Sequence, residues 1–75
     1  MPRVIDEIRS PLTGSVATIL VEDGTAVEAG DPVVEIEAMK MFTLIEAPCA
    51  GTVRMVCEVG EVVGEDDLLA EIEEA

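Results

Sequence analysis

The feature that most constrains this chain is the close spacing of its turn-forming residues. Glycine and proline recur so often that almost no window without them is long enough for a helix. Between them lie short runs rich in valine and isoleucine, at residues 16–21, 33–38, 41–46, 52–57 and 68–72. Short, evenly spaced strands separated by turns are typical of a β-sandwich or a small barrel. The best helical candidate, segment 65–74, is therefore expected to be a turn followed by a strand.

The sequence also repeats itself weakly. A first set of residues recurs in order and spacing: Ile8, Pro11, Gly14 and Val16 match Ile45, Pro48, Gly51 and Val53. After a one-residue slip a second set recurs: Gly24, Val27, Asp31, Glu35, Ile36 and Glu37 match Gly60, Val63, Asp67, Glu71, Ile72 and Glu73. Matched glycines and prolines imply matched backbone requirements, so the chain is expected to contain two copies of one β unit. The predicted structural turns lie at Pro11, Gly14, Gly24, Gly30, Pro48, Gly51 and Gly60.

The repeat predicts where the middle of the chain lies relative to its ends. Segment 33–38 corresponds to 68–73 near the C-terminus, and 42–46 corresponds to 5–9 near the N-terminus. A two-fold relation between the halves therefore exchanges the connection 38–42 with the gap between the chain ends. Lys40 lies in the middle of that connection. We expect two antiparallel sheets facing each other, with Lys40 at one end and both termini at the other, and residues 1–75 forming a single domain.

Charge and composition exclude several classes of function. The net charge is −13, from 17 acidic and 4 basic residues. A nucleic-acid-binding protein needs a basic surface, so that class is excluded, and binding to an anionic membrane is disfavoured. The chain has no histidine and no glycine-rich phosphate loop, which leaves little basis for catalysis of its own. The two cysteines, Cys49 and Cys57, are expected to be reduced, and the protein to be cytoplasmic.

Lys40 is the only lysine in the chain. Soluble proteins normally carry several lysines on their surfaces, so a single one is what a singly modified protein would need. The surrounding segment reads Glu37-Ala38-Met39-Lys40-Met41 and lies between two apolar runs. A tight hairpin would present this amine rigidly to a modifying enzyme.

This segment resembles the biotin carboxyl carrier type of the biotinyl/lipoyl attachment family. The family's modified lysine lies in an Ala-Met-Lys-Met tetrapeptide, which 38–41 matches completely, with the frequently accompanying glutamate at Glu37. The similarity extends over nearly the whole chain, through segments 10–14, 22–24, 29–30 and 47–51. It implies an all-β flattened barrel or sandwich of two four-stranded antiparallel sheets with pseudo-two-fold symmetry.

The resemblance also implies a function. Lys40 would carry covalent biotin, while Glu37, Ala38, Met39 and Met41 would be read by a biotin protein ligase; Met39 and Met41 could equally cover the hairpin's apolar flank. The domain itself would not be catalytic. It would carry carboxyl groups from biotin carboxylase to carboxyltransferase in an acyl-CoA, pyruvate or related carboxylase.

Two alternatives remain open. A lipoyl-type carrier has a similar fold, but usually has an acidic residue before its lysine and alanine after it, unlike Met39 and Met41. An unmodified adaptor of the same fold is the other. Within the biotin family, some bacterial acetyl-CoA carboxylase carriers have a protruding insertion between the early strands, and residues 21–33 are too short to hold it. The sequence is more similar to carriers of acyl-CoA carboxylases, pyruvate carboxylase or transcarboxylase.

Overall fold

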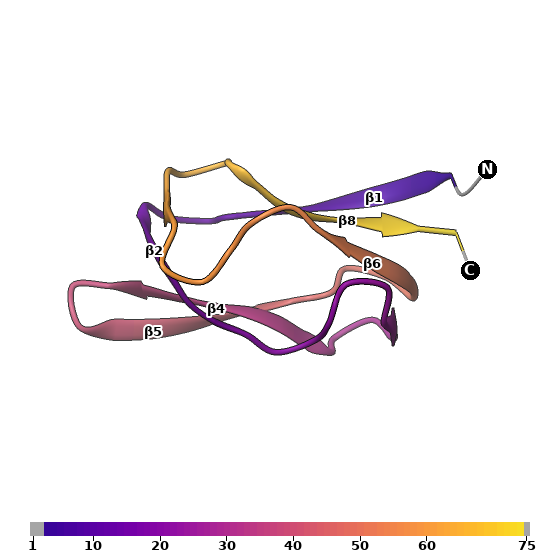
Figure 1. Ribbon diagram of the computed structural model, residues 1–75, viewed down its shortest axis with the longest axis horizontal. Coiled ribbons are helices and arrows are strands. Elements are labelled where there is room, and N and C mark those ends of the chain that lie inside the picture. Colours follow the sequence, from indigo (N-terminus) through magenta and orange to yellow (C-terminus); the bar gives the residue numbers. More distant parts are fainter. Residues whose placement is uncertain (1–2, 75) are drawn as a thin grey trace.

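The computed structural model describes residues 3–74, which form eight β-strands and no helix (Figure 1). The strands are β1 (Val4–Arg9), β2 (Gly14–Ile19), β3 (Ala26–Val27), β4 (Pro32–Ala38), β5 (Met41–Glu46), β6 (Gly51–Met55), β7 (Val62–Val63) and β8 (Leu68–Glu73). No helix that could cross a membrane occurs in this part of the chain. Segment 65–74 is a turn followed by strand β8, as predicted.

The strands form two four-stranded antiparallel sheets. Their orders are β1-β8-β6-β3 and β5-β4-β2-β7. The two orders are related by the sequence repeat. In the repeat, β1 corresponds to β5, β8 to β4, β6 to β2 and β3 to β7, so the two sheets have the same arrangement of equivalent strands. The predicted all-β fold of two facing sheets with an internal two-fold relation is therefore confirmed. The two-residue strands β3 and β7 were not predicted, since so short a strand leaves no apolar run in the sequence.

Equivalent backbone hydrogen bonds support the two-fold relation. The amide of Gly24 donates to the carbonyl of Val53 at 2.7 Å, and that of Gly60 donates to the carbonyl of Val16 at 2.8 Å. Each bond joins a turn of one repeat to a strand of the other. The two repeats are therefore interleaved, and neither half of the chain forms a sheet of its own.

The core between the sheets is built from small branched side chains. Its fully buried members are mostly valine, isoleucine and leucine: Val16, Val33, Val34, Ile36, Val53, Leu69 and Ile72. Most belong to the inward face of a strand, where alternate residues point the same way. Phe42, the only aromatic residue, lies outside this core with 58% of its surface exposed.

The glycines and prolines of the repeat play two different roles. Gly24, Gly30 and Gly60 lie in turns with φ of 89°, 91° and 90°, and Pro11 and Pro48 lie in the bends before β2 and β6. The prediction that Gly14 and Gly51 are turn residues is wrong, because they are the first residues of β2 and β6. A Cβ at Gly14 would lie 2.5 Å from the carbonyl oxygen of Glu37, and one at Gly51 would lie 2.5 Å from that of Glu73. These glycines are required by close strand packing.

The molecule is elongated, with extents of 38 × 18 × 17 Å. The hairpin of β4 and β5 forms one end, and the outer ends of β1 and β8 form the other (Figure 1). At that second end the amide of Glu74 donates to the carbonyl of Arg3 at 2.7 Å, and their side chains form an ion pair at 3.2 Å. The expected separation of Lys40 from the chain ends is thus observed for residues 3–74.

Gly51→Ala should destabilise the fold by about 1–3 kcal/mol or more, because the new methyl group would overlap the backbone of β8. Gly64→Ala is the matched control, since its added Cβ would meet only the carboxylate of Asp67 at an ordinary 3.5 Å. Urea denaturation of both variants measures the difference. Equal midpoints for the two would contradict the close packing at Gly51.

Cys57 should make stability depend on alkaline pH. Burial of this free cysteine, and then the charge of Glu61, raise its thiol pKa. Because the thiol pKa is higher in the folded state than in the unfolded state, the free energy of unfolding has its full value below the pKa of the unfolded thiol. It decreases as pH rises through the pKa of the folded thiol. Urea midpoints of the wild type should therefore begin to fall near the ordinary thiol pKa of about 8.5 and continue to fall at higher pH. Cys57→Ala should show a shallower fall, and an identical slope would contradict this account.

Candidate functional site

The β4–β5 hairpin ends in a two-residue turn made by Met39 and Lys40. Their φ angles are 54° and 65°, and the turn is closed by the pairing of Ala38 with Met41. Two consecutive left-handed residues are the mark of a type I′ turn, which matches the right-handed twist of the strands. Such turns favour Asn-Gly, because most side chains are strained at positive φ. Methionine and lysine at these positions indicate a requirement other than turn stability.

The end of β4 next to the turn packs closely against the neighbouring strand β2. Strand β4 pairs with β5 up to the turn itself, and with β2 on its other side. The backbone of Gly14 in β2 approaches the last residues of β4 closely: a Cβ there would lie 2.9 Å from Ile36 Cγ2 and 3.2 Å from Ala38 Cβ. This packing holds the strained turn in place, since such backbone persists only where its surroundings determine it.

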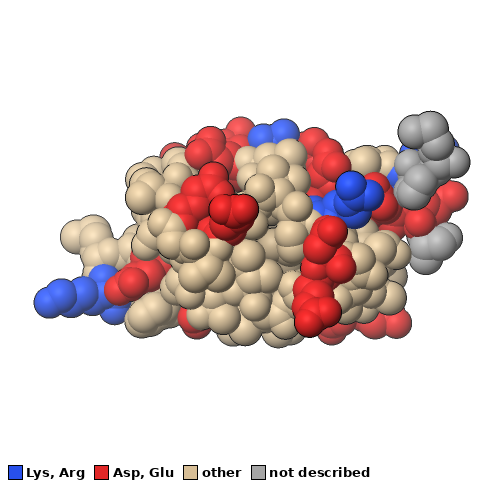
Figure 2. Space-filling view, in the orientation of Figure 1, with Lys and Arg blue, Asp and Glu red and all other residues tan. Residues whose placement is uncertain are grey.

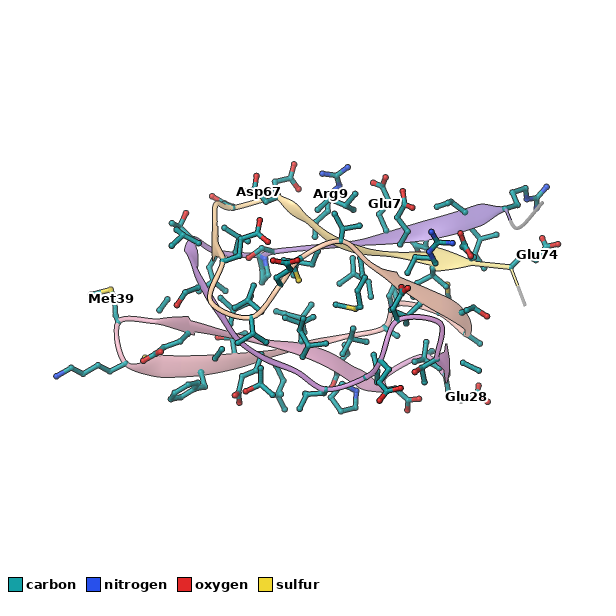
Figure 3. All side chains as sticks on the ribbon, in the orientation of Figure 1. Glu7, Arg9, Glu28, Met39, Asp67 and Glu74 are labelled. Atoms are coloured by element: carbon teal, nitrogen blue, oxygen red, sulfur yellow. The ribbon has the colours of Figure 1, made fainter. Side chains whose placement is uncertain are left out.

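The side chains of the turn project into solvent. Met39 is 94% exposed and Met41 72% exposed, and Lys40 is also exposed. Figure 3 shows Met39 at the opposite end of the molecule from Glu74. In the space-filling view a single basic side chain extends beyond the hairpin end (Figure 2).

Lys40 differs from the three arginines in its electrostatic surroundings. Arg3 pairs with Glu74, Arg9 with Glu7, and Arg54 with Asp23 and Glu73, at distances of 2.8–3.9 Å. Within residues 3–74, Lys40 makes neither an ion pair nor a side-chain hydrogen bond. Its amine is therefore available to a reagent without first breaking a contact.

The other residues singled out in the sequence surround this lysine. Glu37 and Ala38 are half-buried at the end of β4, and Met39 and Met41 flank Lys40 on either side. The structure thus brings Glu37, Ala38, Met39, Lys40 and Met41 together at one tip. Sequence reasoning missed Phe42 and Leu44, which are 58% and 53% exposed on β5. Strand 41–46 is apolar on both faces, so its pattern did not tell which face is buried.

The family of the chain follows from comparison with known proteins. The Biotin_lipoyl family model, described as "Biotin-requiring enzyme", matches residues 6–72. The chain belongs to this family. It is 46% identical over 67 residues to the mitochondrial propionyl-CoA carboxylase alpha chain of Homo sapiens, covering 88% of this chain and 9% of that one. It is 44% identical over 69 residues to the pyruvate carboxylase of Bacillus subtilis, covering 91% and 6%. The chain therefore spans less than a tenth of these relatives.

Solved structures of carboxylases contain the same fold. A single-chain, multi-domain long-chain acyl-CoA carboxylase superposes with a TM-score of 0.84 and 34% identity, over 93% of this chain and 7% of that one. The urea carboxylase of Kluyveromyces lactis superposes with a TM-score of 0.82 and 36% identity, over 88% and 6%. The fold of this Biotin_lipoyl domain is thus that of a small part of large carboxylases.

The turn predicts an unusual response to substitution at Lys40. Lys40→Ala removes no contact and should change the free energy of unfolding by about 0.5 kcal/mol or less. Lys40→Gly relieves the positive φ and should be more stable than Lys40→Ala, by about 0.5–1 kcal/mol. Thermal melts of the two variants compare them directly. A Lys40→Gly variant less stable than Lys40→Ala would contradict the left-handed turn.

Proposed function

We propose that residues 1–75 form one biotin carrier domain, in which Lys40 is the site of covalent biotin attachment. The observation that supports this most strongly is the sole lysine of the chain, which is exposed in a strained two-residue turn of a Biotin_lipoyl domain and makes no ion pair within residues 3–74. Asn-Gly would suit the backbone of this turn better than Met39 and Lys40 do. We infer that the resulting loss of stability is tolerated because the turn presents the amine of Lys40.

Attachment requires an activated acyl group and an accessible amine. The neutral Nζ of Lys40 attacks the carbonyl carbon of biotinyl-adenylate, a C–N bond forms, the bond to the phosphate oxygen breaks, and AMP leaves. The nitrogen loses a proton to solvent, and the product is an amide. The positive charge of Lys40 is lost, so the net charge changes from −13 to −14.

The residues next to Lys40 suit recognition by a biotin protein ligase. Met39 and Met41 present flexible apolar side chains on either side of the amine, and methionine adapts well to a partner surface. Ala38 leaves space at the root of the turn, and Glu37 places a carboxylate there. We infer that the ligase reads Glu37, Ala38, Met39 and Met41 together.

The carrier role then follows from the geometry. Biotin, when attached, supplies a ureido nitrogen that accepts a carboxyl group and later releases it. The chain contributes a rigid, exposed tip and leaves bond-making to its partners, which we infer to be biotin carboxylase and carboxyltransferase. The relatives named as propionyl-CoA and pyruvate carboxylases support this assignment, with an acyl-CoA, pyruvate or a related acceptor. The long modified lysine raises the local concentration of the carried group near each active site.

A cytoplasmic location remains our prediction. Its support is chemical: both cysteines are free, as in a reducing compartment.

Incubation with biotin, ATP and a biotin protein ligase should add one biotinyl group to the wild type. Lys40→Arg is the matched control, because it keeps the positive charge but has no acylable amine, and it should remain unmodified. Intact mass and streptavidin binding measure both proteins. A lipoyl adduct from a lipoate-attaching enzyme in place of the biotinyl group would favour a lipoyl carrier. No adduct with a ligase that is active on another carrier would favour an unmodified adaptor.

A further inference from the structure

The internal two-fold allows one outer surface of the molecule to be compared with the other. Strand β5 is the edge of its sheet, as its repeat β1 is the edge of the other. Beyond a bulge between Val4 and Asp6, β1 pairs with β8 in the same register in which β5 pairs with β4. The fold therefore does not by itself require the side chains of the two strands to differ. Phe42 and Leu44 of β5 correspond in the repeat to Ile5 and Glu7 of β1.

The register of β5 against β4 defines the surface next to Lys40. Phe42 pairs directly with Glu37, and Leu44 pairs with Glu35. Directly paired residues of antiparallel strands point to the same side, and alternate residues of one strand share a face. Phe42, Leu44, Glu35, Glu37 and Glu46 therefore lie on the side away from the core, and we name this set the outer hairpin face.

Two large apolar side chains stand exposed on this face. Phe42 and Leu44 are 58% and 53% exposed, and Phe42 is the only aromatic residue of a chain whose core consists of aliphatic residues. Aromatic residues are enriched at protein interfaces, where they contribute much of the binding energy. The equivalent pair on β1 has only one apolar member.

The charges of the two outer faces also differ. On the face formed by β1, β8 and β6, Glu7 pairs with Arg9 at 2.8 Å and Glu73 with Arg54 at 3.6 Å. In the sequence repeat, Glu46 and Ala17 of the hairpin side take the places of Arg9 and Arg54.

The carboxylates of the hairpin side consequently lack counter-charges. Glu35, Glu37 and Glu46 form no ion pair within residues 3–74. The outer hairpin face therefore combines exposed apolar area with unneutralised negative charge. A complementary surface would be an apolar pocket bordered by arginine or lysine.

We propose that the outer hairpin face is a docking surface for the biotin protein ligase, in addition to the residues beside Lys40. This inference rests on the proposed function. Two copies of a chain with a net charge of −13 repel each other, which disfavours self-association through this face. The occupant is a protein surface of the opposite charge.

The reach of Lys40 identifies the ligase as that occupant. An unmodified lysine has only a four-carbon stem, so an enzyme that acylates it must come close to the hairpin. Phe42 and Leu44 lie two and four residues after Lys40 in the chain, roughly 7 and 14 Å away at the strand rise of ~3.4 Å per residue. A footprint of about 800 Å² per partner centred on Lys40 includes both. The carboxylase active sites act on biotin at the end of the longer modified arm, so their chemistry does not by itself bring a partner onto this face.

Exchange of side chains between the two repeats tests the proposal. The variant Phe42→Ile/Leu44→Glu/Glu46→Arg carries on β5 the residues found at the equivalent positions of β1. With a ligase that acylates the wild type, its KM for the carrier should rise about tenfold or more, with kcat changed less than about twofold. The KM of the wild type should also rise more steeply with salt than that of this variant, because salt screens the carboxylates.

The mirror variant Ile5→Phe/Glu7→Leu/Arg9→Glu is the control, and its KM should stay within about twofold of the wild type. Phe42→Ser and Ile5→Ser form a simpler pair if either triple variant melts at a lower temperature; only Phe42→Ser should raise KM. Unchanged KM in the β5 variants, or equal increases on β1 and β5, would overturn the docking surface while leaving biotin attachment intact. A wild type that no ligase acylates would instead refute the proposed function.

Discussion

The close approach of two glycines to neighbouring backbone is the contact on which this structure depends. Gly14 lets β2 lie against the last residues of β4, and Gly51 lets β6 lie against the last residues of β8. The first contact supports the root of the hairpin that carries Lys40, and the second supports the end where Arg3 and Glu74 meet. The same backbone requirement, used once in each repeat, therefore supports both ends of the molecule. The core, which is mostly valine and isoleucine, fills the space between the two sheets.

Much of this architecture could be predicted from the sequence, because its signals are local or repeated. The turn residues delimit the longer strands, and the repeat predicts that Lys40 lies opposite the chain ends, as Figure 1 shows for the hairpin and the ends of β1 and β8. The role of Gly14 and Gly51 could not be predicted in the same way. A glycine in a turn and a glycine at the start of a tightly packed strand look alike in sequence, and only the neighbouring carbonyl oxygens of Glu37 and Glu73 distinguish them.

The site shows a similar division. The motif around Lys40 identifies the residues of the tip, but not the left-handed conformation of Met39 and Lys40, which contradicts ordinary turn preferences. The exposure of Phe42 and Leu44 could not be predicted either, because β5 carries apolar residues on both of its faces. In both cases the departure from the local rule coincides with the region that we propose a partner contacts. Departures of this kind are expected at functional sites, where stability is given up for presentation.

The amine of Lys40 is the chemical centre of the proposed function, and the state of that amine in the cell is the most direct test. The chain should be isolated from its own host, and its intact mass and the mass of the fragment containing Lys40 should be measured. We expect one biotinyl group, located on Lys40. A bare Lys40 in cells whose ligase biotinylates other carriers, or a lipoyl group at that position, would contradict the account.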